Sequence, residues 1–321
     1  ALFMRAAMHF ELVRLFALPW GATADNSHLG VVIKLLPTKS EADAGVSFPR
    51  NTVKEVYAQI ITDLNKATTL LPEENPRRLN KYTALAFLSR VYLQQQNYGG
   101  ARDAANEVIE SGLFALNASV SAVFSNKDTK ESIWEIQQNE QNNAGTANNG
   151  MATFYASLPG IGRADVRIDD DFVADYYPTG DLRQTQWYYE GTGARAGFTY
   201  CSKWTSFSQN LPVVRIAEMY LTRAEGNLVM GTTVGDTPGG DMAMVKNTLR
   251  TNSTAPANPT LTEVRDERFI ELAFEGQRIH DLRRLRLPTG SYAWNSPKLV
   301  MPIPQREVDA TGGVLVQNPG Y

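Results

Sequence analysis

Residues 82–117 contain a predicted pair of antiparallel helices, which indicates a helical fold class. Apolar residues recur at three- and four-residue steps along the first helix: Tyr82, Leu85, Leu88 and Tyr92. After a short turn at residues 96–100, the second helix carries mostly small residues on one face: Ala101, Ala104, Ala105, Val108 and Ile109. The small side chains let this helix lie close to the large ones of its partner. The unit spans about 34 residues, the size of a tetratricopeptide repeat, although such helix pairs also occur in other helical proteins.

The same helical period recurs in other segments, which we expect to be helices: residues 3–18, 53–71, 212–231, 242–250 and 261–287. Thr52 with Glu55, and Thr260 with Glu263, have the spacing of a capping box at a helix start. Pro212 is placed where a helix would begin, and Gly231 where that helix would end. The chain is therefore predicted to be mainly α-helical.

Residues 139–210 differ from the helical segments on either side. Aromatic residues are about twice as frequent over 150–210 as in the whole chain, which is 10% aromatic. No helical period persists there, and we expect a loop-rich insertion with short strands near 186–190 and 196–204.

This aromatic-rich insertion is the best candidate for a ligand site. Flat rings present a large apolar area, and Tyr and Trp keep a polar group, so both suit the C–H faces and hydroxyl rims of sugar rings. The alternative is that most of these rings fill the core of an irregular region. We predict five aromatic ligand-binding residues and two polar partners: Trp187, Tyr188, Tyr189, Trp204 and Tyr155, with Arg163 and Arg183.

Composition and motifs argue against several classes of protein. The net charge of −3 argues against nucleic-acid binding, and no run of residues is apolar over a membrane-spanning length. The one cysteine and three scattered histidines give no metal-ligand spacing. Residues 169–171 are three aspartates, which we interpret as an acidic turn more readily than as a calcium loop. No cofactor or nucleophile motif is present, so we predict neither cofactor, metal nor enzymatic activity.

Glu267, Glu271 and Glu275 stack at four-residue intervals on the helix predicted over 261–287. Paired carboxylates can perform general acid–base catalysis, as in a glycosidase. Because apolar residues run beside them, an ion-paired structural helix is the favoured interpretation. Four arginines are available as partners: Arg268, Arg278, Arg215 and Arg223.

The first half of the chain also resembles the SusD/RagB family. Its opening helix, FMRAAMHFELVRLF at residues 3–16, is similar to that family's FLRA helix. Residues 50–64, RNTVKEVYAQIITDL, match a segment of the pattern R-x-t-v-x-e-v-Y-x-x-I-x-x-D-L. Residues 84–109 match the family's helix repeat, which contains A-R-V-Y-L and then n-Y-x-x-A.

The second half continues the resemblance in family order. Residues 215–225, RIAEMYLTRAE, are similar to the R-y-A-E-v-y-L motif. Residues 266–284, DERFIELAFEGQRIHDLRR, are close to the more specific E-R-x-x-E-L-x-f-E-G-x-R-x-x-D-L-x-R motif. The tail contains MPIP at residues 301–304 and QNPGY at residues 317–321, like the family's ending.

This resemblance implies a SusD-like fold in which tetratricopeptide-like helix pairs support a ligand-bearing region. It implies a surface-exposed outer-membrane lipoprotein of the Bacteroidetes that captures glycans and passes them to a SusC-like TonB-dependent transporter. A peptide ligand, as in the RagB branch, and an adaptor without a small ligand are the alternatives. One domain over 1–321 is expected, with helical parts at 1–138 and 211–290, the insertion at 139–210 and a tail at 291–321.

Two departures from the family pattern affect these expectations. The family's stretch before its FLRA helix, with a lipidated cysteine and part of the glycan site, has no counterpart ahead of Ala1. We therefore expect the N-terminal portion, including any lipid-anchor cysteine, to lie upstream of this sequence. The insertion is also short, so a smaller or different ligand site is expected.

Overall fold

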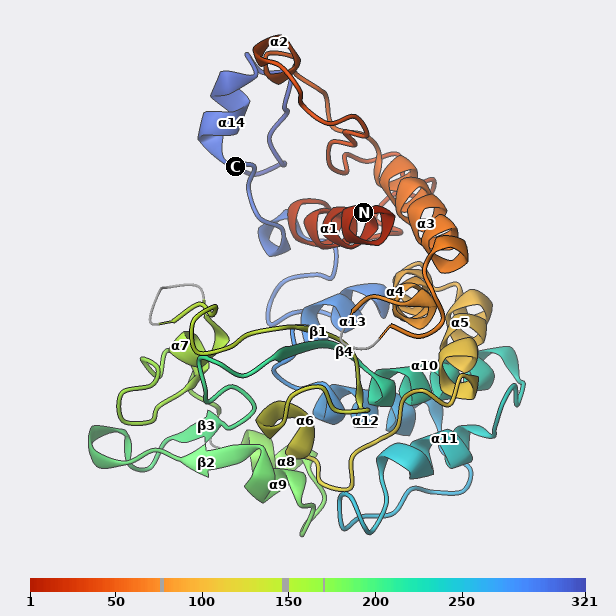
Figure 1. Cartoon of the computed structure of the whole chain (residues 1–321), viewed down its shortest axis with the longest axis vertical. Coiled ribbons are helices and arrows are strands. Elements are labelled where there is room, and N and C mark those ends of the chain that lie inside the picture. The colour runs from red at the N-terminus through yellow and green to blue at the C-terminus, as the bar shows by residue number, and fades with distance from the viewer. Residues whose placement is uncertain (76–77, 146–149, 170) are drawn as a thin grey trace.

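The computed structural model describes residues 1–75, 78–145, 150–169 and 171–321, and it is mainly helical (Figure 1). The helices are α1 (Leu2–Phe16), α2 (Glu41–Ala44), α3 (Val53–Leu70), α4 (Lys81–Gln94), α5 (Tyr98–Glu110), α6 (Ala122–Ser125), α7 (Met151–Tyr155), α8 (Phe172–Tyr176), α9 (Arg183–Gln186), α10 (Ile216–Met230), α11 (Pro238–Val245), α12 (Leu261–Glu271), α13 (Arg278–Arg284) and α14 (Gln305–Ala310). The strands are β1 (Ser132–Ile136), β2 (Tyr188–Glu190), β3 (Thr199–Cys201) and β4 (Leu211–Arg215). Asp170 of the predicted acidic turn and residues 146–149 of the insertion lie outside the described residues.

The predicted helix pair is confirmed as α4 and α5, which pack against each other and then against α3 and α10. Ala101, Ala104 and Ala105 are buried where α5 meets its neighbours. Both capping boxes form: the side chains of Thr52 and Glu55 start α3, and those of Thr260 and Glu263 start α12. Local sequence signals therefore determine most of the helical body.

The strands form two short antiparallel pairs. β2 pairs with β3, in agreement with the strands predicted in the insertion, and β1 pairs with β4. The prediction that Pro212 begins a helix was wrong, because Pro212 lies in β4 opposite Glu135 and α10 starts at Ile216. A proline fits in this strand because a two-stranded sheet leaves an edge on which no backbone N–H is required.

The single long helix predicted over 261–287 was also wrong, since it breaks between α12 and α13. Phe274 and Gly276 adopt positive φ angles of 63° and 78°. The carbonyl oxygens freed by the break accept hydrogen bonds from buried side chains: Lys203 Nζ donates to Glu271 and Ala273 at 3.1 and 2.9 Å, and Trp204 Nε1 donates to Phe274 at 2.9 Å. Contacts from the insertion therefore stabilise the turn that ends α12.

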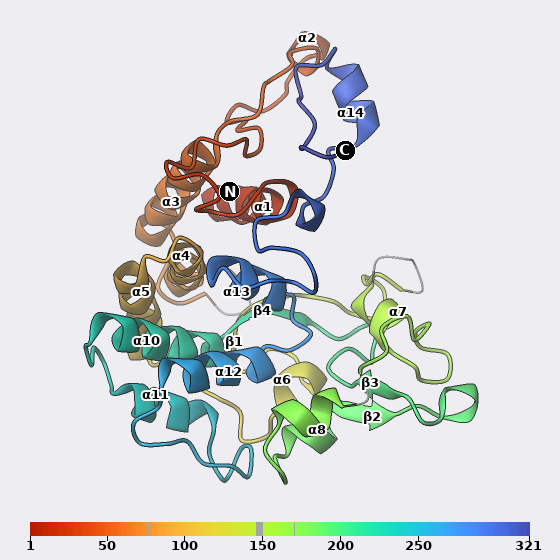
Figure 2. The same cartoon turned by 180° about the vertical axis from the view of Figure 1, so that it is seen from behind.

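Residues 31–50 with α2 and residues 301–321 with α14 form an upper lobe above α1 (Figures 1 and 2). Arg50 joins its two segments by donating to the carbonyl oxygens of Gly30 and Val316. Asn318 in the terminal QNPGY sequence donates to the carbonyl oxygens of Phe16 and Met301. The tail motif therefore fastens the C-terminal end of the chain to the end of α1.

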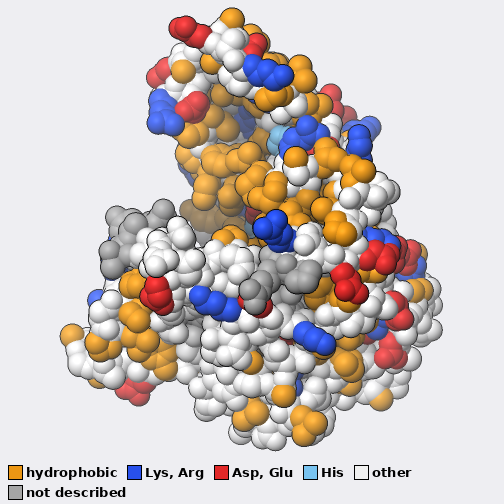
Figure 3. All heavy atoms as spheres, in the orientation of Figure 1, with side chains coloured by type: hydrophobic (Ala, Val, Ile, Leu, Met, Phe, Trp, Pro, Cys, Tyr) orange, Lys and Arg blue, Asp and Glu red, His pale blue; other side chains and the backbone are white. Residues whose placement is uncertain are grey.

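Below the upper lobe the surface is hollowed, and Figure 3 shows hydrophobic side chains gathered there. Met4, Met8 and Leu12 are exposed along one face of α1.

Within the described ranges, no helix is both long enough and apolar enough to cross a membrane. The division of the chain at residues 138, 210 and 290 stays a prediction.

Candidate functional site

The three stacked carboxylates belong to a buried ion-pair network. Glu271, at the end of α12, accepts hydrogen bonds from Arg183 Nη1 at 2.9 Å, Arg215 Nη1 at 2.9 Å and Arg250 Nη2 at 2.7 Å. Glu131 also accepts from Arg215 and Arg250. Burial alone would raise the pKa of the Glu271 carboxyl, but the three guanidinium groups hold it well below its usual range.

The other two carboxylates are held in the same way. Glu267 accepts from Arg183, and Glu275 accepts from Arg215 and Lys203 at 2.8 Å each. The favoured interpretation of an ion-paired helix therefore agrees with the structure, in which all three carboxylates are engaged by buried cationic side chains. Of the four predicted partners only Arg215 takes part. Arg268 pairs with Glu218 and Asp281, Arg223 pairs with Asp241, and Arg278 lies over the ring of Phe269.

Four of the seven predicted ligand residues lie in the interior. Trp187 and Trp204 are 0% and 2% exposed, and their indole N–H groups donate to the carbonyl oxygens of Val120 at 2.8 Å and Phe274 at 2.9 Å. Tyr188 is buried against Tyr177, with 2.7 Å between the hydroxyl oxygens. Arg183 is fully buried in the ion-pair network. In this conformation these side chains fill the core beneath the insertion, which was the alternative left open above.

The other three lie together near α7 at the surface of the insertion. Tyr155 is half-buried against Phe274, and the Tyr189 hydroxyl accepts a 2.7 Å hydrogen bond from the backbone N–H of Ser157. Arg163 is exposed and lies over the ring of Phe154. The binding role of all seven residues stays a prediction, and this surface group keeps ring area that a ligand could reach.

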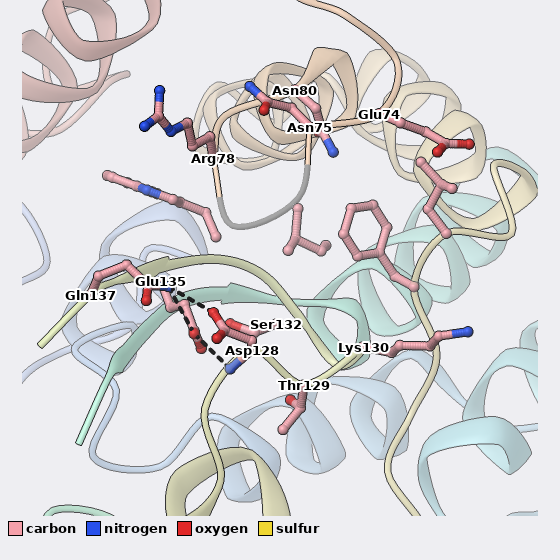
Figure 4. Close-up of a pocket in the computed structure, with 14 residues that line it drawn as sticks. Glu74, Asn75, Arg78, Asn80, Asp128, Thr129, Lys130, Ser132, Glu135 and Gln137 are labelled. Carbon is pink, nitrogen blue, oxygen red and sulfur yellow. Dashed lines mark hydrogen bonds between the residues drawn. The ribbon is translucent and has the colours of Figure 1, made fainter. Parts of the chain in front are cut away.

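A separate pocket of about 480 Å³ lies beside β1 (Figure 4). Its walls come from the segment between α3 and α4, the segment after α5, and β1 with the residues that precede it. The lining residues are Glu74, Asn75, Arg78, Asn80, Leu113, Phe114, Asp128, Thr129, Lys130, Ser132, Ile133, Trp134, Glu135 and Gln137. Arg78, Asn75 and Asn80 lie on one wall, and Glu135, Gln137 and Ser132 on the other (Figure 4).

The pocket combines a fixed aromatic ring with polar groups. Trp134 is half-buried, and its ring meets Phe3 and Phe87 edge-on at centroid distances of 5.2 and 5.5 Å. Glu135 Oε1 accepts from the Asp128 backbone N–H at 3.0 Å and from Gln137 Nε2 at 3.1 Å. An aromatic face beside amide and carboxylate groups is the usual composition of a polar-ligand pocket.

Some oxygen atoms in the pocket wall have no hydrogen-bond partner among the residues described. They are buried, and they belong to Thr129 (Oγ1), Ser132 (Oγ) and Glu135 (Oε2). A buried polar atom without a partner costs about 1–3 kcal/mol, so these three oxygen atoms make this wall of the pocket locally unfavourable.

Sequence reasoning missed this pocket because it assembles from three segments between residues 74 and 137. The available signal was Trp134 in the short sequence Ser-Ile-Trp-Glu-Ile, whose β-branched and aromatic residues favour a strand. Among the described residues, no group of His, Cys, Asp and Glu side chains is arranged to hold a metal ion.

Comparison with known families supplies two matches. Residues 1–93 match the profile of a SusD-like group described as starch-binding and associating with the outer membrane. Residues 184–297 match the profile of the SusD family, SusD_RagB. The second match includes β2, β3, β4, α10, α11, α12 and α13, and with them the network residues Arg215, Arg250 and Glu271.

Individual relatives match over the whole chain. SusD-like protein P2 of Formosa agariphila is 26% identical over all of this chain and 73% of its own. A crystal structure of a SusD superfamily protein from Bacteroides thetaiotaomicron shares 27% identity and a TM-score of 0.82, over 99% of this chain and 76% of that one. A candidate sugar-binding protein from Bacteroides vulgatus shares 26% identity and a TM-score of 0.83, over 100% of this chain and 76% of that one.

Proposed function

Because this chain belongs to the SusD/RagB family, we propose that it binds oligosaccharides or polysaccharides at the outer-membrane surface and delivers them to a SusC-like TonB-dependent transporter. Support comes from the starch-binding, outer-membrane description of the group matched by residues 1–93, and from the sugar-binding relative. The family is one of binding proteins, and the buried carboxylates of α12 are engaged by arginines. A role in capture without catalysis is therefore the best-supported function.

The proposed glycan site is the pocket beside β1. The observation that carries this assignment is the position of Trp134, a fixed indole ring beside Glu135 and Gln137 in a pocket of about 480 Å³. The C–H face of a sugar ring stacks on an aromatic ring, while its hydroxyl groups bond to carboxylate and amide groups. A pocket of this size fits one or two sugar rings and leaves the remainder of a polymer outside.

The test is a titration of tryptophan fluorescence with a panel of glycans and peptides. We expect a saturable change with one glycan class, and calorimetry, which does not depend on the mutated fluorophore, should show a loss of affinity of at least tenfold in the variant Trp134→Ala. Trp294→Ala is the matched control, because Trp294 is also partly buried but does not line the pocket. The control should bind glycan as the unchanged protein does.

Other outcomes would redirect the proposal. Glycan binding that survives Trp134→Ala but fails in Tyr189→Ala or Tyr155→Ala would move the site to the insertion. A response to peptides alone would replace the glycan with a peptide, and silence across the panel would favour an adaptor.

Delivery to a transporter is tested separately, by isolating the protein from its native outer membrane under mild detergent. Copurification of a TonB-dependent transporter supports the proposal, and recovery of the protein alone contradicts it. Protease treatment of intact cells tests surface exposure, since a surface lipoprotein is cleaved while periplasmic proteins are protected.

A further inference from the structure

A second feature, independent of the glycan pocket, is an excess of positive charge between α1 and α13. Arg283 is 4% exposed, and no carboxylate of the described residues lies within 4 Å of its guanidinium group. Its Nη1 donates to the carbonyl oxygen of Arg14 at 2.7 Å, and its Nε is buried without a partner. A buried guanidinium group that has no anion beside it is unfavourable, because burial removes the water that would stabilise its charge.

Arg14 adds to this excess from the opposite helix. Its guanidinium group is stacked on Phe10, and its one carboxylate partner, Glu11, is 37% exposed. The Nε of Arg14 is also buried without a partner. By contrast, neighbouring Arg284 has two carboxylate partners, Glu225 and Asp281. The unsatisfied donors therefore belong to Arg14 and Arg283.

Both arginines line one narrow cavity that has room for about one water-sized group. Four residues with polar side-chain groups also line it: Tyr57, Gln94, Trp20 and His280. None of these four side chains forms a side-chain hydrogen bond elsewhere within the residues described. Burial and the charges of Arg14 and Arg283 lower the pKa of His280 to about 2, so its ring is neutral and does not compete for an anion.

We propose that this cavity binds a single monatomic anion of the halide class, with chloride as the physiological ion. Halides accept hydrogen bonds from guanidinium, hydroxyl and indole donors, and the residues that line this cavity carry all three kinds of donor. A carboxylate, phosphate or sulfate needs space for several heavy atoms, so the cavity size selects against them. Arg14 and Arg283 are 269 residues apart, so the bound ion links the first helix to α13.

The test is thermal unfolding of the full chain at constant ionic strength, with sodium chloride exchanged for sodium gluconate. Gluconate is too large to enter, so we expect Tm to be a few degrees higher in chloride and to rise with chloride concentration. Bromide should substitute for chloride, and crystals soaked in bromide should show an anomalous peak between Arg14 and Arg283.

Two variants and one control sharpen this test. Arg283→Gln should abolish the difference between chloride and gluconate, and Tyr57→Phe should reduce it. Arg306→Gln, at a side chain that is 87% exposed, should leave it unchanged. If Arg283→Gln does not fold, the Tm difference between chloride and gluconate and the bromide soak, both measured on the unchanged protein, still test the proposal. Equal Tm values in the two salts, with ordered water and no bromide in the cavity, would overturn the proposal.

Discussion

The aromatic cluster beneath the insertion and the pocket beside β1 use the same residue types in opposite ways. In the cluster, the N–H groups of Trp187 and Trp204 donate to backbone carbonyl oxygens and the rings are buried. In the pocket, the Trp134 ring is half-buried, and its N–H donates to no residue in the described part of the chain. Aromatic content alone therefore does not distinguish a ligand site from a core. In these two regions the distinction lies in the indole N–H groups, which are bonded to the backbone in the cluster and, in the pocket, have no partner among the residues described.

The largest expected effect comes from the network that anchors the cluster to the helical body. Glu271→Ala leaves three buried guanidinium groups short of a carboxylate, so the free energy of unfolding should fall by about 3–5 kcal/mol. Thr260→Ala, at the N-cap of the same helix, should cost only about 1 kcal/mol. Urea denaturation measures both. A loss for Glu271→Ala no larger than that for the N-cap variant would contradict a central role for the network.

The same dependence on buried charge predicts a response to acid. Burial opposes ionisation of Glu218, but Arg90 and Arg268 lower its pKa from 4.5 to about 2. Because the folded state holds the lower pKa, its stabilising effect is present above pH 4.5 and is lost as the pH falls toward 2. At about 1.4 kcal/mol per pH unit, this group contributes about 3 kcal/mol.

Urea midpoints measured from pH 7 to pH 2 should therefore fall most steeply below pH 4.5. Glu218→Gln should be less stable at pH 7, since Arg90 loses its carboxylate, and its midpoint should depend less on pH. A midpoint that stays constant down to pH 2 would show that these ion pairs add nothing to folding.

A matched pair of substitutions tests the comparison of the two regions directly. Trp187→Phe removes a buried donor and leaves the Val120 carbonyl oxygen unpaired, so stability should fall by about 1–3 kcal/mol while glycan affinity is unchanged. Trp134→Phe keeps a ring in the pocket and should lower affinity a few-fold with a smaller loss of stability. The reverse pattern would assign the glycan site to the cluster.

The smallest expected effect is on a single hydrogen bond in the pocket. Gln137→Ala should weaken glycan binding by about two- to tenfold, since one hydrogen bond contributes about 0.5–1.5 kcal/mol. Stability should fall by no more than about 1 kcal/mol, because Gln137 is exposed although it donates to Asp128 and Glu135. Gln305→Ala, on α14, is the control for a surface glutamine. Isothermal titration calorimetry can resolve this difference, and equal affinities would remove Gln137 from the site.

What the sequence predicts correctly depends on local interactions. The α4–α5 pair, both capping boxes and the end of α10 at Gly231 follow from residues within a few positions of one another. The break after α12 does not, because the turn at Phe274 depends on Lys203 and Trp204, about seventy residues away in the sequence. The charge pattern indicated an ion-paired helix, but the identity of Arg183 and Arg250 as partners depends on the tertiary fold.

Prediction of the candidate site from the sequence is limited in the same way, because the site depends on contacts between distant residues. Tyr155, Tyr189 and Arg163 are only partly buried or exposed, and each contacts α7 or the residues next to it, but their binding role stays a prediction. The pocket beside β1 could not be anticipated from composition, because its aromatic and polar residues lie in three segments that are individually unremarkable in composition.

The buried network also has a consequence for the order in which the chain folds. Glu131 and Arg250 are 119 residues apart, and Arg215 and Glu271 are 56 residues apart, so their ion pairs close long loops. Closing such loops is entropically costly, and contacts of high sequence separation slow folding. The α4–α5 pair can form as soon as its residues are available, whereas Glu131 and Arg215 obtain their full set of partners only after α12 has been synthesised. The helical repeat is thus expected to fold early, and the charge network to complete the structure as a late, cooperative step.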